Sequence, residues 1–211
     1  MSGETIITEG CLQFTFPSDQ CLKLDATSFY RHHYLKETDA RCVDFVFVDD
    51  TQVLWLLEVK DYRPEKGNKD HSNLGKILIE KFTNSLSILF CLAKAPCSNE
   101  KDLAEKTLHA KSIICVLHIE GNCKLQKGKL NALQEDAIKI FSGNLKVKLR
   151  SLNLKFQLSS REMPGDVKWK VASLPFSVKE MPAENSPVST SDSAEPKKKK
   201  KCRSKQPPHR A

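Results

Sequence analysis

Residues 41–63, RCVDFVFVDDTQVLWLLEVKDYR, contain the most strand-like pattern of the chain. Runs of Val, Phe, Leu and Trp on either side of the step Asp49–Gln52 predict two β-strands joined by a tight turn. Charged residues interrupt both runs, with Asp44 in the first and Glu58 and Lys60 in the second. Because burying a lone charge costs several kcal/mol unless it is paired or bound to a metal, the fold must compensate these three charges.

The spacing of these charges predicts how the two strands pair. Residues two apart in a strand share a face, so Glu58 and Lys60 project side by side while Val59 points to the opposite face. A register that places Asp44 opposite Glu58 leaves the loop Asp50–Gln52, a common hairpin type. A loop one residue shorter would put Asp44 on the wrong face unless a β-bulge restored it. We therefore expect the longer loop.

The same residues resemble the PD-(D/E)xK nuclease superfamily, in which an acidic residue of one strand precedes a (D/E)-x-K triplet in the next. Here the matching positions are Asp44 and Glu58-Val59-Lys60, with Val43-Asp44 in place of Pro-Asp. The resemblance implies an α/β fold of restriction-endonuclease-like type, with a mixed β-sheet flanked by helices. It also makes Lys81, on the helix after the triplet strand, a candidate for an extra active-site residue. The alternative for Lys81 is that its ammonium extends to the surface.

The chemistry of a divalent cation supports a site at the same position. Mg²⁺, or Mn²⁺, prefers oxygen ligands and keeps several waters. The bound cation would lower the pKa of a water and neutralise charge that develops on a phosphate. Lys60 would orient or deprotonate the attacking water, or stabilise the transition state. Asp25 and Glu37 are two alternatives for a third acidic ligand. The predicted ligands are Asp44, Glu58 and the carbonyl of Val59.

Several cations are candidates for contacts with nucleic acid. Arg63, at the end of the second strand, could bind a flanking phosphate through its guanidinium. Arg31 belongs to the aromatic and basic cluster 28–34, whose rings could stack on bases. The alternative for this cluster is that Phe29 and Tyr34 belong to the core and the histidines are solvated. The remaining candidates are Lys81, Lys197, Lys198, Lys199, Lys200 and Lys201.

The rest of the chain alternates predicted strands and helices, which favours a parallel crossover after the hairpin. The helix that usually precedes the first acidic strand of the superfamily is not clear in the sequence. Residues 25–40 would have to supply it, or the chain does without it. The predicted elements are a hairpin of two short strands in residues 11–25, a buried helix over Leu74–Ala93, a helix capped by Ser98 or Asn99 that runs to His109, a strand over Ser112–Ile119, a helix over Lys129–Phe141 and one or two edge strands over Leu145–Leu158.

Charge and composition divide the chain of 211 residues into two parts. Eight of its 34 basic residues lie in Lys197–Ala211 without an acid, and the remaining 26 balance the 26 acidic residues. A neutral body argues against a domain that coats long DNA by electrostatics alone. We expect a nuclease-like domain over residues 1–180. Residues 181–211 read as a disordered Ser/Pro-rich linker with a polylysine tail.

The polylysine tail and the lack of long apolar runs indicate where in the cell the protein is expected. The segment PKKKKK is typical of a nuclear localisation signal and equally of a non-specific nucleic-acid arm; in a bacterial host the protein would be cytoplasmic. No apolar run approaches the length of a membrane span, so we expect an intracellular protein without a membrane partner. The eight cysteines form no CxxC pair and favour a reducing compartment. His118 and Cys123 alone do not make a tetrahedral zinc set.

These observations predict a metal-dependent nuclease that hydrolyses phosphodiester bonds, of DNA rather than RNA, through Asp44, Glu58 and Lys60. The alternative is a catalytically inactive nuclease fold that serves as a nucleic-acid-binding or protein-interaction module. No helix-turn-helix or zinc-finger pattern is visible to select a target. A homodimer or a protein partner would then supply specificity.

Overall fold

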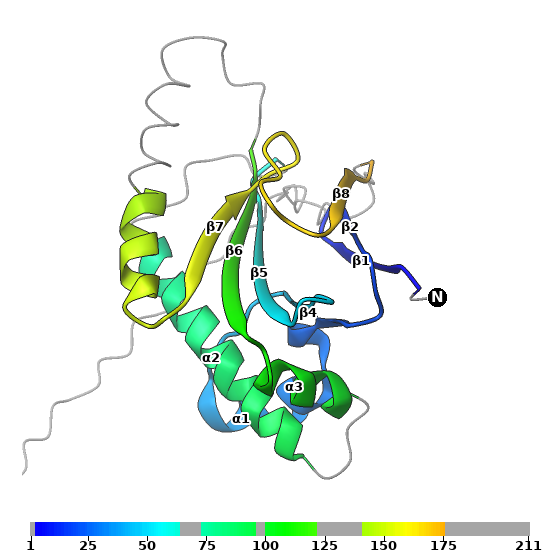
Figure 1. Cartoon of the computed structure of the whole chain (residues 1–211), viewed down its shortest axis with the longest axis vertical. Coiled ribbons are helices and arrows are strands. Elements are labelled where there is room, and N and C mark those ends of the chain that lie inside the picture. The colour runs from blue at the N-terminus through cyan, green and yellow to red at the C-terminus, as the bar shows by residue number, and fades with distance from the viewer. Residues whose placement is uncertain (1–2, 64–72, 96–99, 122–140, 176–211) are drawn as a thin grey trace, which may run out of the picture. The chain divides into compact units, whose positions relative to one another are not determined.

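The computed structural model of the chain describes residues 3–63, 73–95, 100–121 and 141–175 (Figure 1). The chain divides into two units, Met1–Phe176 and Ser177–Ala211. The second unit lies outside the described residues, and so do the predicted basic tail, most of the predicted helix Lys129–Phe141 and the predicted capping residues Ser98 and Asn99. No helix in the described ranges is long and apolar enough to span a membrane.

A mixed five-stranded sheet forms the centre of the described part of the chain, in the order β3-β4-β5-β6-β7. The pairs β3–β4 and β4–β5 are antiparallel, whereas β5–β6 and β6–β7 are parallel. The predicted crossover to a parallel strand is therefore confirmed. The strands are β3 (Cys21–Lys23), β4 (Phe45–Val48), β5 (Val53–Asp61), β6 (Ser112–Glu120) and β7 (Lys155–Ser159).

The β4–β5 hairpin has the register that the sequence predicts. Phe45 pairs with Leu57 and Val48 with Leu54, so the ladder extended by one residue would place Asp44 opposite Glu58. Residues 50–52 form the loop, which is closed by a 3.1 Å hydrogen bond from the Asp49 N–H to the Val53 carbonyl. The last loop residue, Gln52, has φ +62°, as expected for a loop of this length.

Helices cover one face of this sheet. Helix α2 (Leu74–Lys94) connects β5 to α3 (Lys101–Leu108), which leads into β6. Both helices were predicted within one or two residues of these bounds. Leu78, Phe82 and Leu89 of α2 are buried in one apolar cluster with Leu54 and Leu56 of β5. The even-numbered face of β5, which also carries Glu58 and Lys60, therefore faces the helical layer.

A three-stranded antiparallel sheet covers the opposite face, in the order β1-β2-β8. It consists of β1 (Thr5–Glu9), β2 (Leu12–Phe16) and β8 (Lys170–Ser173). Its buried Phe14 and Phe16 pack on Phe45 and Phe47, with ring centroids 5.2 Å apart for Phe14 and Phe45. The odd-numbered residues of β5 belong to this second core. The five-stranded sheet is thus sandwiched between helices and a smaller sheet.

The predicted hairpin in residues 11–25 is wrong. Both of its strands exist, but β2 pairs with β1 and β8, whereas β3 pairs with β4 in the other sheet. Every second residue of β2 is fully buried between the two sheets. The strand therefore pairs with β1 and β8, which lie with it over the odd-numbered face of β5. The turn residues Pro17–Asp19 therefore mark a corner between two sheets.

The predicted edge strands over Leu145–Leu158 are wrong in their first half. Residues 141–150 form a helix, and β7 supplies the only strand of this segment. Leu145 and Leu149, four residues apart, are buried, whereas Val147 between them is 72% exposed. Spacing by four residues places two side chains on one helix face, and this outweighs the apparent alternation.

Residues 25–40 do supply a helical segment before β4, which begins at Phe45, so that Asp44 lies one residue before the strand and not inside it as predicted. A 3-10 turn, η1 (Leu24–Ala26), is followed by η2 (Tyr30–Tyr34), which has π-helical hydrogen bonding, and by α1 (Leu35–Thr38). The segment ends at Asp39, which has φ +52°. From there the chain runs past α2 toward Asp44.

Candidate active site

Strand β5 continues beyond the end of β4, and this overhang creates the candidate site. Pairing with β4 stops at Phe45 and Leu57, so Glu58–Asp61 have no partner on that side. The carboxylate of Asp44 takes the position instead, and its Oδ2 accepts a 2.6 Å hydrogen bond from the N–H of Val59. In a strand the N–H and C=O of one residue point to the same neighbour. The Val59 carbonyl therefore faces the side of Asp44, as a ligand role would require.

Glu58 is fully buried, and two lysines compensate its charge. Lys60 Nζ lies 2.7 Å from Glu58 Oε1. Lys81 Nζ reaches across from α2 and lies 2.7 Å and 2.8 Å from the two carboxylate oxygens. A buried carboxylate is tolerated only with such partners. The side chain of Lys60 is 30% exposed and that of Lys81 15%, so Lys60 is the lysine that reaches solvent more readily.

Asp44 has an abnormal affinity for protons. Burial, together with the negative charge of Glu58, raises the pKa of the Asp44 carboxyl to about 7, against the opposing effects of Lys81 and the Val59 N–H. The negative charge of Glu58 disfavours the charged form of Asp44. A divalent cation held by these residues would offset that effect.

Asp25 is one of the two acids considered as a third ligand. Its Oδ1 is buried without a hydrogen-bond partner among the described residues. Burial raises the pKa of Asp25, and the charges of Lys23 and Lys81 lower it, so Asp25 lies within electrostatic reach of the lysine that pairs with Glu58. Glu37 is exposed on α1. Asp25 is thus coupled electrostatically to Lys81, but among the described residues no third acid stands close enough to Asp44 and Glu58 to share a metal with them.

Sequence reasoning missed Glu9. This residue ends β1 and forms an ion pair with Lys23, whose Nζ lies 2.5 Å from Glu9 Oε2. The charge of Glu9 raises the pKa of both Asp25 and Asp44. Nothing in the sequence near Glu9 marks it, because it reaches the site only through packing of the second sheet on the first.

The predicted nucleic-acid contacts are only partly brought to the site. Arg31 is exposed, with its Nε donating to the Asp25 carbonyl at 3.0 Å. Arg63 is engaged by its own protein: it pairs with Asp61 at 2.6 Å and donates to Ser173 Oγ at 2.6 Å and to the Cys11 carbonyl at 3.2 Å. Lys81 belongs to the Glu58 cluster. Residues 197–201 lie outside the described residues.

The aromatic and basic cluster 28–34 has both a buried and a solvated side. Tyr30 is buried, and Phe29 and Tyr34 pack against the helical core. His32 and His33 are exposed. The alternative interpretation of this cluster, core aromatics with solvated histidines, therefore describes its geometry, and we assign its rings no role in base stacking.

His118 belongs to a separate buried network. Its Nδ1 lies 3.2 Å from Ser159 Oγ and its Nε2 3.1 Å from Glu120 Oε1, while Arg161 Nε donates to Glu120 Oε2 at 3.0 Å. Burial lowers the pKa of His118 against the opposing charge of Glu120. His118, Ser159 and Glu120 are all buried and are hydrogen-bonded to one another, which is the pattern of a structural network. Cys123, the other residue considered for zinc, lies outside the described residues.

The residues present fit a hard divalent cation. Mg²⁺ is commonly held by one or two carboxylates with several waters, which is the donor set that Asp44, Glu58 and the Val59 carbonyl offer. Within the described ranges, no three His, Cys, Asp or Glu side chains stand close enough together to hold a metal. Such a cation would thus depend on the backbone carbonyl and on water, and Lys81 would have to leave Glu58.

Comparison of the chain with protein-family models, with curated proteins and with solved structures found no match. The site is therefore interpreted from its own geometry. That geometry brings Asp44, Glu58, Val59 and Lys60 together at the end of β5, with Lys81 bonded to Glu58.

Proposed function

We propose that this chain is a metal-dependent nuclease of the PD-(D/E)xK type, which hydrolyses phosphodiester bonds of DNA. The observation that carries the proposal is the fully buried Glu58, placed beside Asp44 and Lys60 where β4 has ended and β5 continues. The mixed sheet, with a helical segment before Asp44 and a long helix after Lys60, agrees with the element order of that superfamily.

In this proposal each residue has a distinct role. Asp44 and Glu58, with the Val59 carbonyl, would hold Mg²⁺ or Mn²⁺, with waters as the remaining ligands. The bound cation supplies Lewis acidity to a water and to a phosphate oxygen. The partly exposed ammonium of Lys60 holds the attacking water or balances the charge that develops on the phosphate. The buried surroundings strengthen each of these electrostatic interactions.

A second candidate function is supported by Lys81. Its ammonium contacts both oxygens of Glu58, so the carboxylate is already neutralised without a metal. On this alternative the acidic and basic side chains form a structural network in a catalytically inactive nuclease fold. The chain would then bind nucleic acid or another protein without cutting it.

Cleavage of end-labelled single-stranded, duplex and branched DNA, and of a matching RNA, separates the two candidates. Each substrate is incubated with Mg²⁺, Mn²⁺ or EDTA. We expect metal-dependent cutting by the wild type and a loss of at least about 10²-fold in Lys60→Ala, the usual effect of removing such a group. Lys76→Ala is the matched control, since Lys76 lies on α2 with a side chain that is 78% exposed.

A chain ending at Met181 completes this experiment. Retained cutting by the shortened chain places the chemistry in the described fold and makes the basic tail an accessory. No cutting by any variant, together with DNA binding that disappears on shortening, overturns the nuclease proposal in favour of the non-catalytic alternative.

A further inference from the structure

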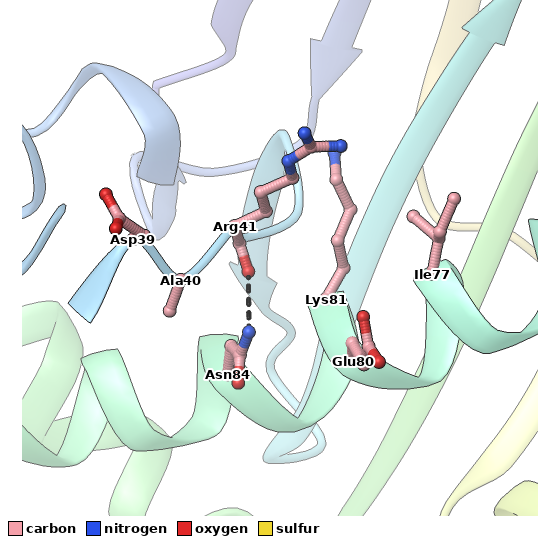
Figure 2. A pocket seen from close by; sticks show the side chains of 7 residues that line it. All are labelled: Asp39, Ala40, Arg41, Ile77, Glu80, Lys81 and Asn84. Atoms are coloured by element: carbon pink, nitrogen blue, oxygen red, sulfur yellow. Dashed lines mark hydrogen bonds between the residues drawn. The ribbon is translucent and has the colours of Figure 1, made fainter. Parts of the chain in front are cut away.

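A hollow of about 170 Å³ lies beside the candidate site, between α2 and the segment 39–41 (Figure 2). We call it the Arg41 hollow. Lys81 lines it while its ammonium pairs with Glu58, so the hollow adjoins the proposed metal site directly. The other charged residues that line it are Asp39, Arg41 and Glu80.

The backbone of Arg41 is held by a hydrogen bond to α2, whereas its guanidinium is exposed and can bind a ligand. Its carbonyl accepts a 3.2 Å hydrogen bond from Asn84 Nδ2, which ties the segment to α2 three residues before Asp44. The side chain is exposed, and its guanidinium forms no ion pair or hydrogen bond with any described residue. Figure 2 shows the Arg41 and Lys81 side chains extending toward one another above the helix, with Asp39 at the far side.

On the basis of the proposed function, we infer that the Arg41 hollow binds a backbone phosphate of the DNA strand, and that a metal ion on Glu58 completes this anion site by displacing Lys81. Lys81 now contacts both oxygens of Glu58, so the ammonium and a divalent cation compete for the same carboxylate. The flexible four-carbon stem of a lysine allows its head to move without a change in α2.

The balance of charge in the hollow explains why the two events are coupled. Before displacement, Glu58 holds the ammonium of Lys81, and the carboxylate of Asp39 opposes Arg41, so an anion gains little. Glu80 is partly balanced by Lys76, whose Nζ lies 3.8 Å from its Oε1. After displacement, Arg41 and Lys81 are two cations facing one hollow, which a phosphate diester would bridge. By linkage, a metal that strengthens phosphate binding is itself bound more tightly in the presence of DNA.

The test measures binding rather than turnover. The affinity of a fluorescein-labelled DNA duplex is measured by anisotropy with Mn²⁺ or EDTA, in the full chain carrying Lys60→Ala so that DNA is not cut. We expect Mn²⁺ to raise the affinity at least tenfold. Adding Arg41→Gln should reduce the Mn²⁺-dependent increase in DNA affinity at least fivefold. Arg41→Lys in its place should restore part of that increase. Adding Lys94→Gln, an exposed lysine at the end of the same helix, should change the gain less than twofold.

A second measurement addresses Lys81 without DNA. Isothermal titration with Mn²⁺ should show tighter metal binding in Lys81→Met than in wild type, because no ammonium competes, while the metal-dependent gain in DNA affinity falls. If Arg41→Gln keeps the full gain, or if Lys81→Met binds Mn²⁺ no more tightly, the inference is overturned. In that case metal-dependent cutting by the wild type would leave the proposed function standing, whereas absent metal binding and absent cutting would remove both.

Discussion

The backbone N–H of Val59 donates a 2.6 Å hydrogen bond to Oδ2 of Asp44, and this contact joins the two halves of the candidate motif. The side chain of Val59 points into the core between the two sheets, so its backbone is held in place from the opposite side. The position of the Asp44 carboxylate is therefore fixed by rigid elements. The same contact requires only an acceptor oxygen, which an asparagine also provides.

Asp44→Asn should abolish cutting without unfolding the protein. The amide oxygen can still accept from Val59, but the neutral side chain is a poor ligand for a hard cation. We expect the rate of DNA cleavage in Mg²⁺ to fall by at least about 10²-fold, the size of effect seen when one electrostatic group is removed from an active site. Mn²⁺ affinity, measured by isothermal titration, should fall in parallel.

Asp50→Asn is the matched control for this change. Asp50 is an exposed residue of the hairpin loop, at the opposite end of the same hairpin. It should cut DNA within twofold of wild type. Equal loss of cutting in both variants, or undiminished cutting in Asp44→Asn, would contradict the role given to Asp44.

The pKa of Asp44 predicts a pH-dependent stability in the absence of metal. The carboxyl has a pKa of about 7 in the folded protein, against 3.8 as its ordinary value. Between these pH values the folded state holds a proton that the unfolded state has released, so the free energy of unfolding falls as pH rises from about 4 to 7. Asp44→Asn lacks this dependence. Its stability relative to wild type should therefore rise with pH, by roughly 1.4 kcal/mol per pH unit at most.

Urea unfolding in EDTA at several pH values between 4.5 and 7.5 measures this difference. His118 changes stability in the opposite sense, because burial lowers its pKa below 6.5 and its unfolded form takes up a proton first on acidification. Since both proteins contain His118, its contribution cancels in the comparison. A difference that does not change with pH would show that Asp44 is ionised throughout.

The sequence predicted those parts of the fold that local pattern determines. The β4–β5 register follows from which residues must share a face, and α2 follows from a long apolar pattern with helical spacing. The pairing of β2 with β1 and β8 could not be predicted from local pattern. It depends on the tertiary packing of this strand over the odd-numbered face of β5. The second sheet, and with it Glu9, was missed for this reason.

The same distinction holds for the candidate site. The alternation within one strand places Glu58 and Lys60 together, and the register adds Asp44. The contact of Lys81 with both oxygens of Glu58 depends on how α2 is rotated over the sheet, which the apolar pattern alone does not fix. The electrostatic coupling of Asp25 to Lys81 depends on the turn η1, for which the sequence carried no clear pattern.

Residues 141–150 give a direct test of helix against strand. Val147 and Leu149 would share a face in a strand, but in the helix Leu149 is fully buried and Val147 is 72% exposed. Leu149→Ala should lower the free energy of unfolding by about 2–5 kcal/mol. Val147→Ala should change it by less than about 0.5 kcal/mol, as at most exposed sites. Similar losses in both variants, measured by urea unfolding, would indicate a strand.

A substitution at Arg63 tests whether this residue stabilises the fold or binds a phosphate of the substrate. Its guanidinium is tied to Asp61, to Ser173 on β8 and to the Cys11 carbonyl, so it links the end of β5 to the second sheet. Because bonds to a charged group contribute about 1.5–3 kcal/mol, Arg63→Ala should lower the free energy of unfolding by about 2 kcal/mol. DNA affinity of the folded variant should stay within twofold of wild type. Arg150→Ala, an exposed cation on the helix of residues 141–150, should change neither quantity. A tenfold loss of DNA affinity with unchanged stability would instead assign Arg63 to the substrate.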